Sequence, residues 1–97
     1  MYWTFDQAPN VACISEESVI GGQPVLVVTH YDDDHSWAFL SEQVFHPAQA
    51  LIVAMSTVIE AHPELNEIAD LPPGWTATRG SVGEPWSKQR DNFDAQV

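Results

Sequence analysis

Two short apolar runs with an acidic stretch between them constrain the fold of this chain most strongly. The runs are Val25–Val28 and Trp37–Leu40, and both are rich in β-branched or aromatic residues. Between them lie three consecutive aspartates, Asp32, Asp33 and Asp34. Apolar runs separated by a short polar cluster are typical of two strands joined as a hairpin. The first run has no polar alternation, so we expect a central strand covered on both faces.

The rest of the chain supplies further elements of both kinds. Val11–Ser15 has the composition of a short strand, and Trp75–Arg79 alternates as a fourth strand would. Apolar residues recur at helical spacing within Ala48–Ala61, which predicts one main helix. A second, short helix is expected from Glu64 to Leu71, where early acids favour a helix start. These elements predict an α+β fold, with a three- to four-stranded antiparallel sheet and the main helix and the short helix packed on one face.

The C-terminal stretch differs in composition from the rest of the chain. It contains Gly80, Gly83 and Pro85, and after residue 86 its only large apolar residue is Phe93. We therefore expect residues 1–79 to form a single α+β domain and residues 80–97 to be a flexible tail. Within the domain, residues 1–10 form an aromatic N-terminal segment that packs over an edge of the core. A chain of 97 residues has the length of one domain with one core.

Charge is distributed unevenly along the chain. Fourteen Asp and Glu residues against three Lys and Arg residues give a formal net charge of −11. The bases are Arg79, Lys88 and Arg90, so residues 1–78 contain no Lys or Arg. Nucleic acids and anionic membranes present phosphate groups, so this chain should repel both. We expect it to attract a basic partner protein, although such a charge would also serve solubility alone.

Partner binding would use exposed carboxylates together with an aromatic anchor, because charges steer association and aromatic side chains stabilise the complex. The candidate partner-binding residues are Asp32, Asp33 and Asp34 at the hairpin tip, Glu16 and Glu17, and Trp86. Glu16 and Glu17 are expected to be exposed, at the same end of the sheet as the hairpin tip or at the opposite end.

The sequence contains no pattern typical of catalysis, so we expect no enzyme, no catalytic residues and no cofactor. It lacks a nucleophile elbow and a glycine-rich phosphate loop. His30 and His35 flank the aspartates, but their spacing matches neither a structural zinc site nor an EF-hand, so no metal is expected. Two alternatives remain: a non-catalytic interaction or regulatory module, and a small metal-dependent enzyme that uses the His30–His35 loop.

Cys13 and the apolar runs bear on the cellular compartment. Cys13 is the single cysteine, so no intramolecular disulfide can form, and its apolar neighbours predict a buried thiol in a strand. Met1 is followed by no signal-peptide pattern. The longest apolar run, Leu51–Met55, is far shorter than the roughly 20 residues of a membrane-spanning helix. We therefore expect a cytoplasmic protein.

Several segments of the chain, taken in order, resemble a known family. They read ACIS, GGQPV, DDDHSWAFLSEQ, HPAQALIVAMSTVIEAHPEL and DLPPGWTATR. Over about residues 11–79 they resemble the bacterial immunity protein family thirty-three, formerly a domain of unknown function. The acidic stretch before Trp37 is shorter than in many members, and the PPGWTATR…EPW ending differs from their usual form. The resemblance implies a protein that binds and neutralises a bacterial toxin and has no catalytic residues.

Overall fold

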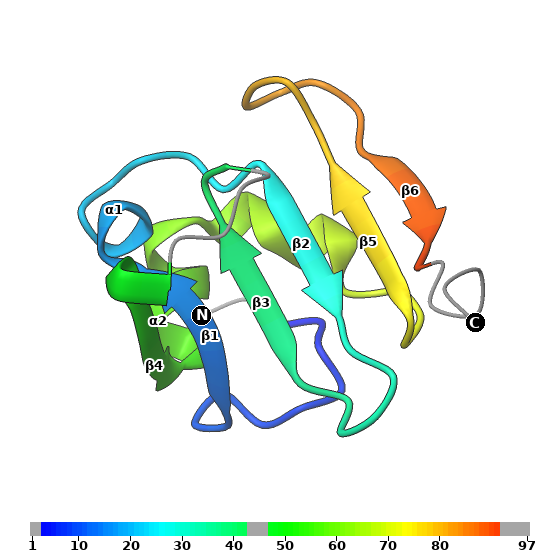
Figure 1. Ribbon diagram of the computed structural model, residues 1–97, viewed down its shortest axis with the longest axis horizontal. Helices are drawn as coiled ribbons and strands as arrows, with labels where there is room; N and C mark the ends of the chain where they lie inside the picture. The colour runs from blue at the N-terminus through cyan, green and yellow to red at the C-terminus, as the bar shows by residue number, and fades with distance from the viewer. Residues whose placement is uncertain (1–2, 43–46, 92–97) are drawn as a thin grey trace.

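The expected hairpin lies at the centre of the fold. The computed structural model describes residues 3–42 and 47–91. Strands β2 (Val27–His30) and β3 (Trp37–Leu40) pair antiparallel, and His30 lies opposite Trp37. All four residues of β3 are buried, and β2 has neighbours on both edges (Figure 1). The sequence therefore predicted the central hairpin correctly, although its first strand is Val27–His30 and not Val25–Val28.

In the described part of the chain, six strands form one mixed sheet in the order β4-β1-β3-β2-β5-β6. Besides the hairpin, the strands are β1 (Ala12–Glu16), β4 (Ala50–Ala54), β5 (Trp75–Thr78) and β6 (Ser87–Arg90). β1 runs parallel to β3, and the other neighbouring pairs are antiparallel. The fold is α+β as expected, but three to four antiparallel strands was an undercount.

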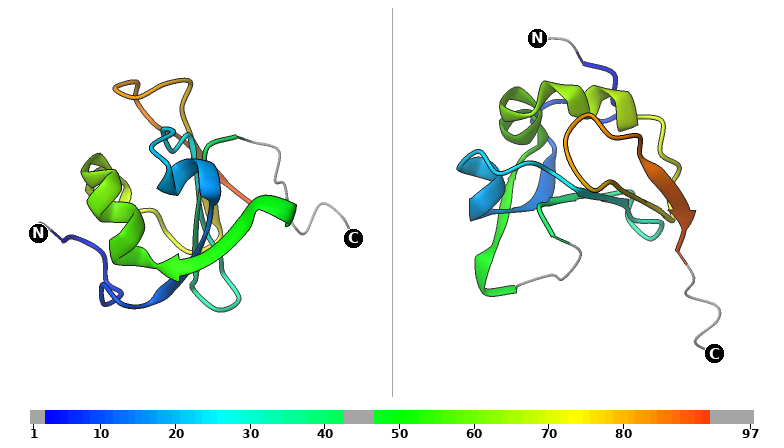
Figure 2. Two further views of the ribbon diagram at one scale, coloured as in Figure 1. Left: turned by 90° about the vertical axis from the view of Figure 1, so that its left-hand side faces the viewer. Right: turned by 90° about the horizontal axis from the view of Figure 1, so that it is seen from above.

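Short helices accompany the sheet. They are the α-helices α1 (Glu17–Ile20) and α2 (Met55–Ala61) and the 3₁₀ segments η1 (Pro47–Gln49) and η2 (Pro63–Ile68). α2 and η2 follow one another across one face of the sheet (Figures 1 and 2). The core lies between them and that face, and the η2–β5 connection leads from this layer to the hairpin end of the sheet.

The predicted main helix is correct only in its second half. Met55, Val58 and Ile59 are buried on α2 at the expected helical spacing. The first half of the prediction is wrong, because Ala50–Ala54 forms β4 and pairs with β1 along its whole length. Adjacent β-branched residues in this run fit a sheet well, and strand pairing overrides the weak helical pattern of so short a segment.

The polar C-terminal stretch also differs from its prediction. We expected a flexible tail from residue 80, but Ser87–Arg90 forms β6, in register with β5 from Thr78↔Ser87 to Trp75↔Arg90. All four side chains of β6 are exposed. A polar sequence can occupy such an edge position because main-chain hydrogen bonds, not side-chain burial, hold the strand there. Residues 92–97 lie outside the described residues.

The core joins the sheet to the N-terminal segment. Phe5 is buried and packs edge-on against Trp37, with ring centroids 5.0 Å apart. Cys13 is 2% exposed, which confirms the predicted buried thiol. Desolvation raises the pKa of this thiol to about 12. Its thiolate is therefore scarce at neutral pH, which makes Cys13 a poor nucleophile.

Candidate functional site

The connection between β2 and β3 presents three carboxylates to solvent. Asp32, Asp33 and Asp34 are all exposed. The Asp34 N–H donates to Asp33 Oδ1 at 2.9 Å, and the Ser36 N–H donates to Asp34 Oδ1 at 3.0 Å. Hydrogen bonding with Ser36 lowers the pKa of the Asp34 carboxyl. The loop is therefore ordered by the carboxylates of Asp33 and Asp34, while all three aspartates remain exposed.

Two further acids come to this end of the sheet from distant parts of the chain. Asp91 follows β6, and its N–H donates to Gly74 O at 2.7 Å. Asp6 lies on the N-terminal segment, whose Gln7 side chain donates to His35 O of the hairpin loop at 3.4 Å. We call this group of acidic residues at the hairpin end of the sheet the acidic end; it consists of Asp6, Asp32, Asp33, Asp34 and Asp91.

The negative charges of the acidic end affect the pKa of Tyr31. Burial raises the pKa of its phenol, and the negative charges of Asp91, Asp33 and Asp34 raise it further. A neighbouring negative charge disfavours the phenolate, so these carboxylates act together on one group. In the structure, Asp91 therefore lies near the three predicted hairpin acids. The sequence had predicted Asp91 to be part of a flexible tail.

Glu16 and Glu17 do not join the acidic end. β1 is parallel to β3, which begins at the hairpin loop. The C-terminal end of β1 therefore lies at the other end of the sheet from that loop (Figure 1). Glu17 is exposed there, at the start of α1. Glu16 is only 1% exposed, and its Oε1 accepts from the Ser41 N–H at 2.9 Å and from the Ser41 hydroxyl at 3.3 Å. The expectation that Glu16 is exposed is therefore wrong, since its carboxylate connects β1 to the end of β3.

Trp86 makes its contacts within the chain. Its ring lies over the Arg79 guanidinium, 4.2 Å from the centroid to Cζ, and its indole N–H donates to Glu67 Oε1 at 3.0 Å. Beneath it, Arg79 Nε and Nη2 donate to Val25 O at 3.1 and 3.0 Å, and Nη2 lies 3.3 Å from Glu64 Oε1. Trp86 is half-buried in this arrangement. Its role as an aromatic anchor for a partner stays a prediction.

The C-terminal bases pair with acids beside η2. Arg79 lies close to Glu64 and Glu67, and Lys88 Nζ lies 3.5 Å from Asp70 Oδ1. Residues 1–78 contain no Lys or Arg, but in the folded chain Arg79 and Lys88 pair with acids of this part. The folded surface is therefore not acidic throughout. Lys88 and Arg90 are two positions apart, as side chains on one face of a strand are. This spacing was the sequence pattern that could have indicated β6.

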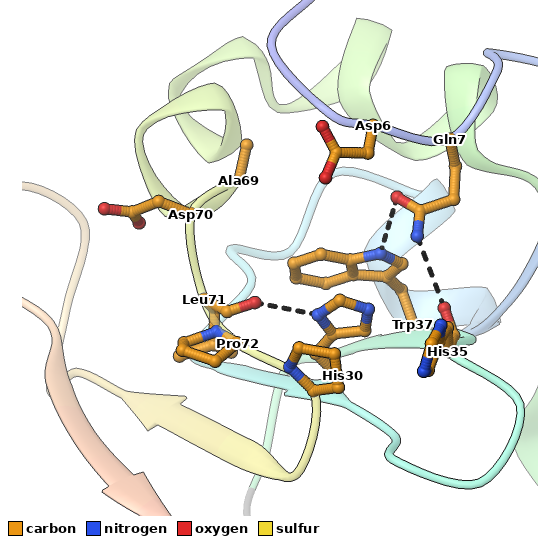
Figure 3. A pocket seen from close by; sticks show the side chains of 10 residues that line it. Asp6, Gln7, His30, His35, Trp37, Ala69, Asp70, Leu71 and Pro72 are labelled. Atoms are coloured by element: carbon orange, nitrogen blue, oxygen red, sulfur yellow. Dashed lines mark hydrogen bonds between the residues drawn. The ribbon is translucent and has the colours of Figure 1, made fainter.

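A pocket of about 470 Å³ lies next to the acidic end, between the hairpin, the N-terminal segment and the η2–β5 connection (Figure 3). Its lining includes Asp6, Gln7, His30, His35, Trp37 and Leu71. These residues are far apart in sequence and meet because the N-terminal segment packs onto the hairpin. The two histidines stand out in the sequence because they flank the aspartates, whereas no sequence pattern points to Asp6 or Leu71 as their neighbours.

His30 is held tightly at the floor of this pocket. It is 7% exposed, and its ring stacks on Trp37 with centroids 4.0 Å apart. Its Nδ1 lies 2.7 Å from Leu71 O. A carbonyl oxygen only accepts, so Nδ1 carries the proton, and in the neutral ring Nε2 carries the lone pair. Nε2 is buried and has no hydrogen-bond partner among the residues that the structure describes.

The metal-dependent alternative lacks a ligand set in the described residues. His35 is exposed, and its ring centroid lies 6.2 Å from that of His30. Within residues 3–42 and 47–91, no group of three or more His, Cys, Asp or Glu side chains is arranged to hold a metal ion. A protein zinc site normally takes three or four such ligands. The two histidines alone would therefore make an incomplete site.

Comparisons with known proteins leave the family open. No protein-family model, curated protein or solved structure matches this chain. No helix in the described part of the chain combines the length and the apolar composition needed to cross a membrane. The resemblance to the bacterial immunity protein family thirty-three therefore stays a prediction.

Proposed function

We propose that this chain is a non-catalytic binding protein that presents its acidic end to a basic partner protein. The family resemblance names the class of partner, a bacterial toxin that the chain would neutralise in the cytoplasm. The observation that supports the proposal best is the gathering of carboxylates from three parts of the chain at one end of the sheet, with Asp6 and the three hairpin aspartates exposed and Asp91 half-buried. The raised pKa of Tyr31 agrees with a shared negative field at that end.

The positions of the three basic residues favour the acidic end as the surface that contacts the partner protein. Arg79 pairs with Glu64 and Lys88 pairs with Asp70, so these two bases offset acids other than those of the hairpin loop. Arg90 is exposed directly before Asp91 and offsets the acidic end only in part. A concentrated negative patch raises the association rate of a positively charged partner.

Order in the hairpin loop supports rapid, specific docking. Hydrogen bonds from Asp34 N–H and Ser36 N–H already position the carboxylates of Asp33 and Asp34. A partner would therefore meet charges that need little rearrangement, which reduces the entropy lost on binding. Trp86, at the other end of β5 and β6, would need to leave Arg79 before it could serve as an anchor.

The first experiment identifies the partner and then tests the site. Protein captured by this chain from a lysate of the source bacterium should be basic, and toxic when expressed alone. Its association rate constant is then measured for the wild type and for the D32N/D33N/D34N variant. Asparagine keeps the side-chain oxygens that accept in the loop, so the variant changes charge and not loop structure. We expect a decrease of about tenfold in the association rate constant, greatest at low salt.

The matched control is E17Q/E60Q/E84Q, which removes the same charge from exposed residues outside the acidic end. It should change the rate far less than the hairpin variant does. Screening shortens the Debye length from about 10 Å at 0.1 M salt to about 3 Å at 1 M, so binding should weaken as salt is added. An anionic partner, or equal binding by the D32N/D33N/D34N variant, would contradict the proposal. Salt-insensitive binding would favour the general interaction module instead.

A further inference from the structure

The Nε2 nitrogen of His30 has no hydrogen-bond partner among the described residues, and His30 lines the pocket beside the acidic end. Because Nδ1 donates to Leu71 O, Nε2 can act only as an acceptor while the ring is neutral. Buried polar atoms in proteins nearly always have a partner, so an orphan acceptor on a residue that lines a pocket points to a ligand that brings a donor. Figure 3 shows this nitrogen on the side of the ring toward Gln7 and His35.

The other polar groups around the pocket restrict the charge of that ligand. The Asp6 carboxylate also lines the pocket, and in Figure 3 the Trp37 ring lies between it and the His30 ring. The Trp37 indole N–H is already donated to Gln7 Oε1 at 3.0 Å, and Gln7 Nε2 donates to His35 O. The described lining therefore offers acceptors and negative charge, and its indole and amide donors are used within the chain. An anionic ligand would be repelled, and a cation rich in N–H groups would be attracted.

A guanidinium group meets these requirements best. It carries a permanent positive charge, has five N–H donors and no acceptor, and its plane stacks on aromatic rings. An ammonium group also donates, but it is more strongly hydrated and has no flat face to lie against the exposed His35 ring. The weaker hydration of the guanidinium and its larger number of donors therefore favour arginine over lysine.

We propose that this pocket binds the guanidinium group of an arginine side chain. One N–H donates to His30 Nε2, and others donate to the Asp6 carboxylate. The exposed His35 side chain, next to His30, moves aside to admit the ligand. The inference rests on the proposed function for the source of the arginine, which is the basic partner.

The test uses blocked amino acids as probes, so it needs no partner. N-acetyl-arginine amide is titrated into the ¹⁵N-labelled protein, and the ring nitrogens of His30 and the indole nitrogen of Trp37 are followed by NMR. N-acetyl-citrulline amide, which has nearly the same shape without the charge, is the control ligand. We expect saturable shifts at both sites with the arginine compound, and binding about tenfold weaker with the citrulline compound.

Two variants link the binding to named atoms. H30N keeps a side-chain amide near the position of Nδ1, able to donate to Leu71 O, and removes Nε2. D6N removes the charge of an exposed side chain and is not expected to affect folding, so it serves even if H30N unfolds. Each should weaken arginine binding about tenfold, and E17Q should leave it unchanged. Absence of saturable shifts, equal affinity for citrulline, or wild-type binding by D6N would overturn the proposal.

The pocket and the proposed function can fail separately. If the arginine compound binds as expected but the captured partner is anionic, the pocket proposal stands and the toxin-binding proposal falls. If the basic partner binds H30N and D6N as it binds the wild type, the role of the pocket in that complex is overturned while the proposed function stands.

Discussion

The Arg79 guanidinium lies 4.2 Å beneath the centre of the Trp86 ring, so the first base of the chain is covered by an aromatic side chain seven positions later. The guanidinium is 1% exposed and donates twice to Val25 O. This contact ties the β5–β6 loop to the start of β2. It holds the residue just before β6 against the body of the fold, beside the main-chain pairing of β6 with β5.

Replacing Trp86 by alanine should destabilise the fold. The substitution uncovers Arg79 and removes the hydrogen bond from the indole to Glu67. We expect a loss of about 1–2 kcal/mol in the free energy of unfolding, measured by urea denaturation. Trp86→Phe keeps a ring over the guanidinium and should lose less. Wild-type stability of the alanine variant would contradict the packing described here.

Replacing Arg79 by lysine should also destabilise the fold, although the charge is kept. Lysine cannot donate twice to Val25 O while it reaches Glu64, because its donors do not form a planar fork. The expected loss is about 1–3 kcal/mol, the usual cost of leaving a buried polar group poorly paired. Lys88→Arg, at an exposed ion pair, is the control and should change stability little. Equal effects of the two substitutions would argue against a special role for the Arg79 site.

Glu16 should matter for stability and not for partner binding. Glu16→Ala leaves the Ser41 N–H without its acceptor, so we expect a loss of about 1–3 kcal/mol by urea denaturation. Glu16→Gln keeps a side-chain oxygen in place and should be much closer to the wild type. Glu17→Ala removes an exposed carboxylate and serves as the comparison. If Glu16→Gln slowed association with a basic partner while stability was unchanged, the structural role would be wrong.

Stability should fall at alkaline pH because of Cys13 and Tyr31. Folding raises the pKa of Cys13 from 9.0 to about 12 and raises that of Tyr31 above 10.0. For a group with a raised pKa, the stabilisation is complete below the unfolded-state pKa and is lost as pH rises toward the folded-state value. The free energy of unfolding should therefore decrease from pH 9 upward, as urea denaturation at pH 7 and at pH 10 would show.

Two variants separate these contributions. Cys13→Ala should give a flatter pH dependence from pH 9 upward, and Tyr31→Phe a flatter one above pH 10. Both variants remove an ionisable group, so their curves are compared by slope and not by absolute stability. A wild-type slope in the Cys13→Ala variant would mean that the thiol ionises as easily in the folded chain as in the unfolded chain.

Local sequence predicted the features that depend on near neighbours. The central hairpin follows from two apolar runs around a polar cluster, and the burial of Cys13 follows from its apolar neighbours in a short strand. The exposure of Asp32, Asp33 and Asp34 follows from the cost of burying three adjacent charges. The helical spacing of Met55, Val58 and Ile59 is likewise local.

Tertiary structure decided where weak local signals were overridden by pairing. Ala50–Ala54 became a strand because β1 offered it a free edge, and Ser87–Arg90 became one because β5 did. In both cases main-chain hydrogen bonds to another strand outweighed the preference of the segment itself. The residues within each segment do not contain that information, since the partner residues lie 9 to 15 positions away for β6 and 34 to 42 positions away for β4.

The sequence by itself determined the sign and the amount of charge and the central hairpin that carries much of it. Only the folded chain decided which charges face solvent together. It buried Glu16, covered Arg79, brought Asp91 to the hairpin end, and placed Asp6 in the same pocket as His30. The physical reason is that charge adds along a chain, whereas a surface or a pocket is made by residues that meet only when distant segments pack.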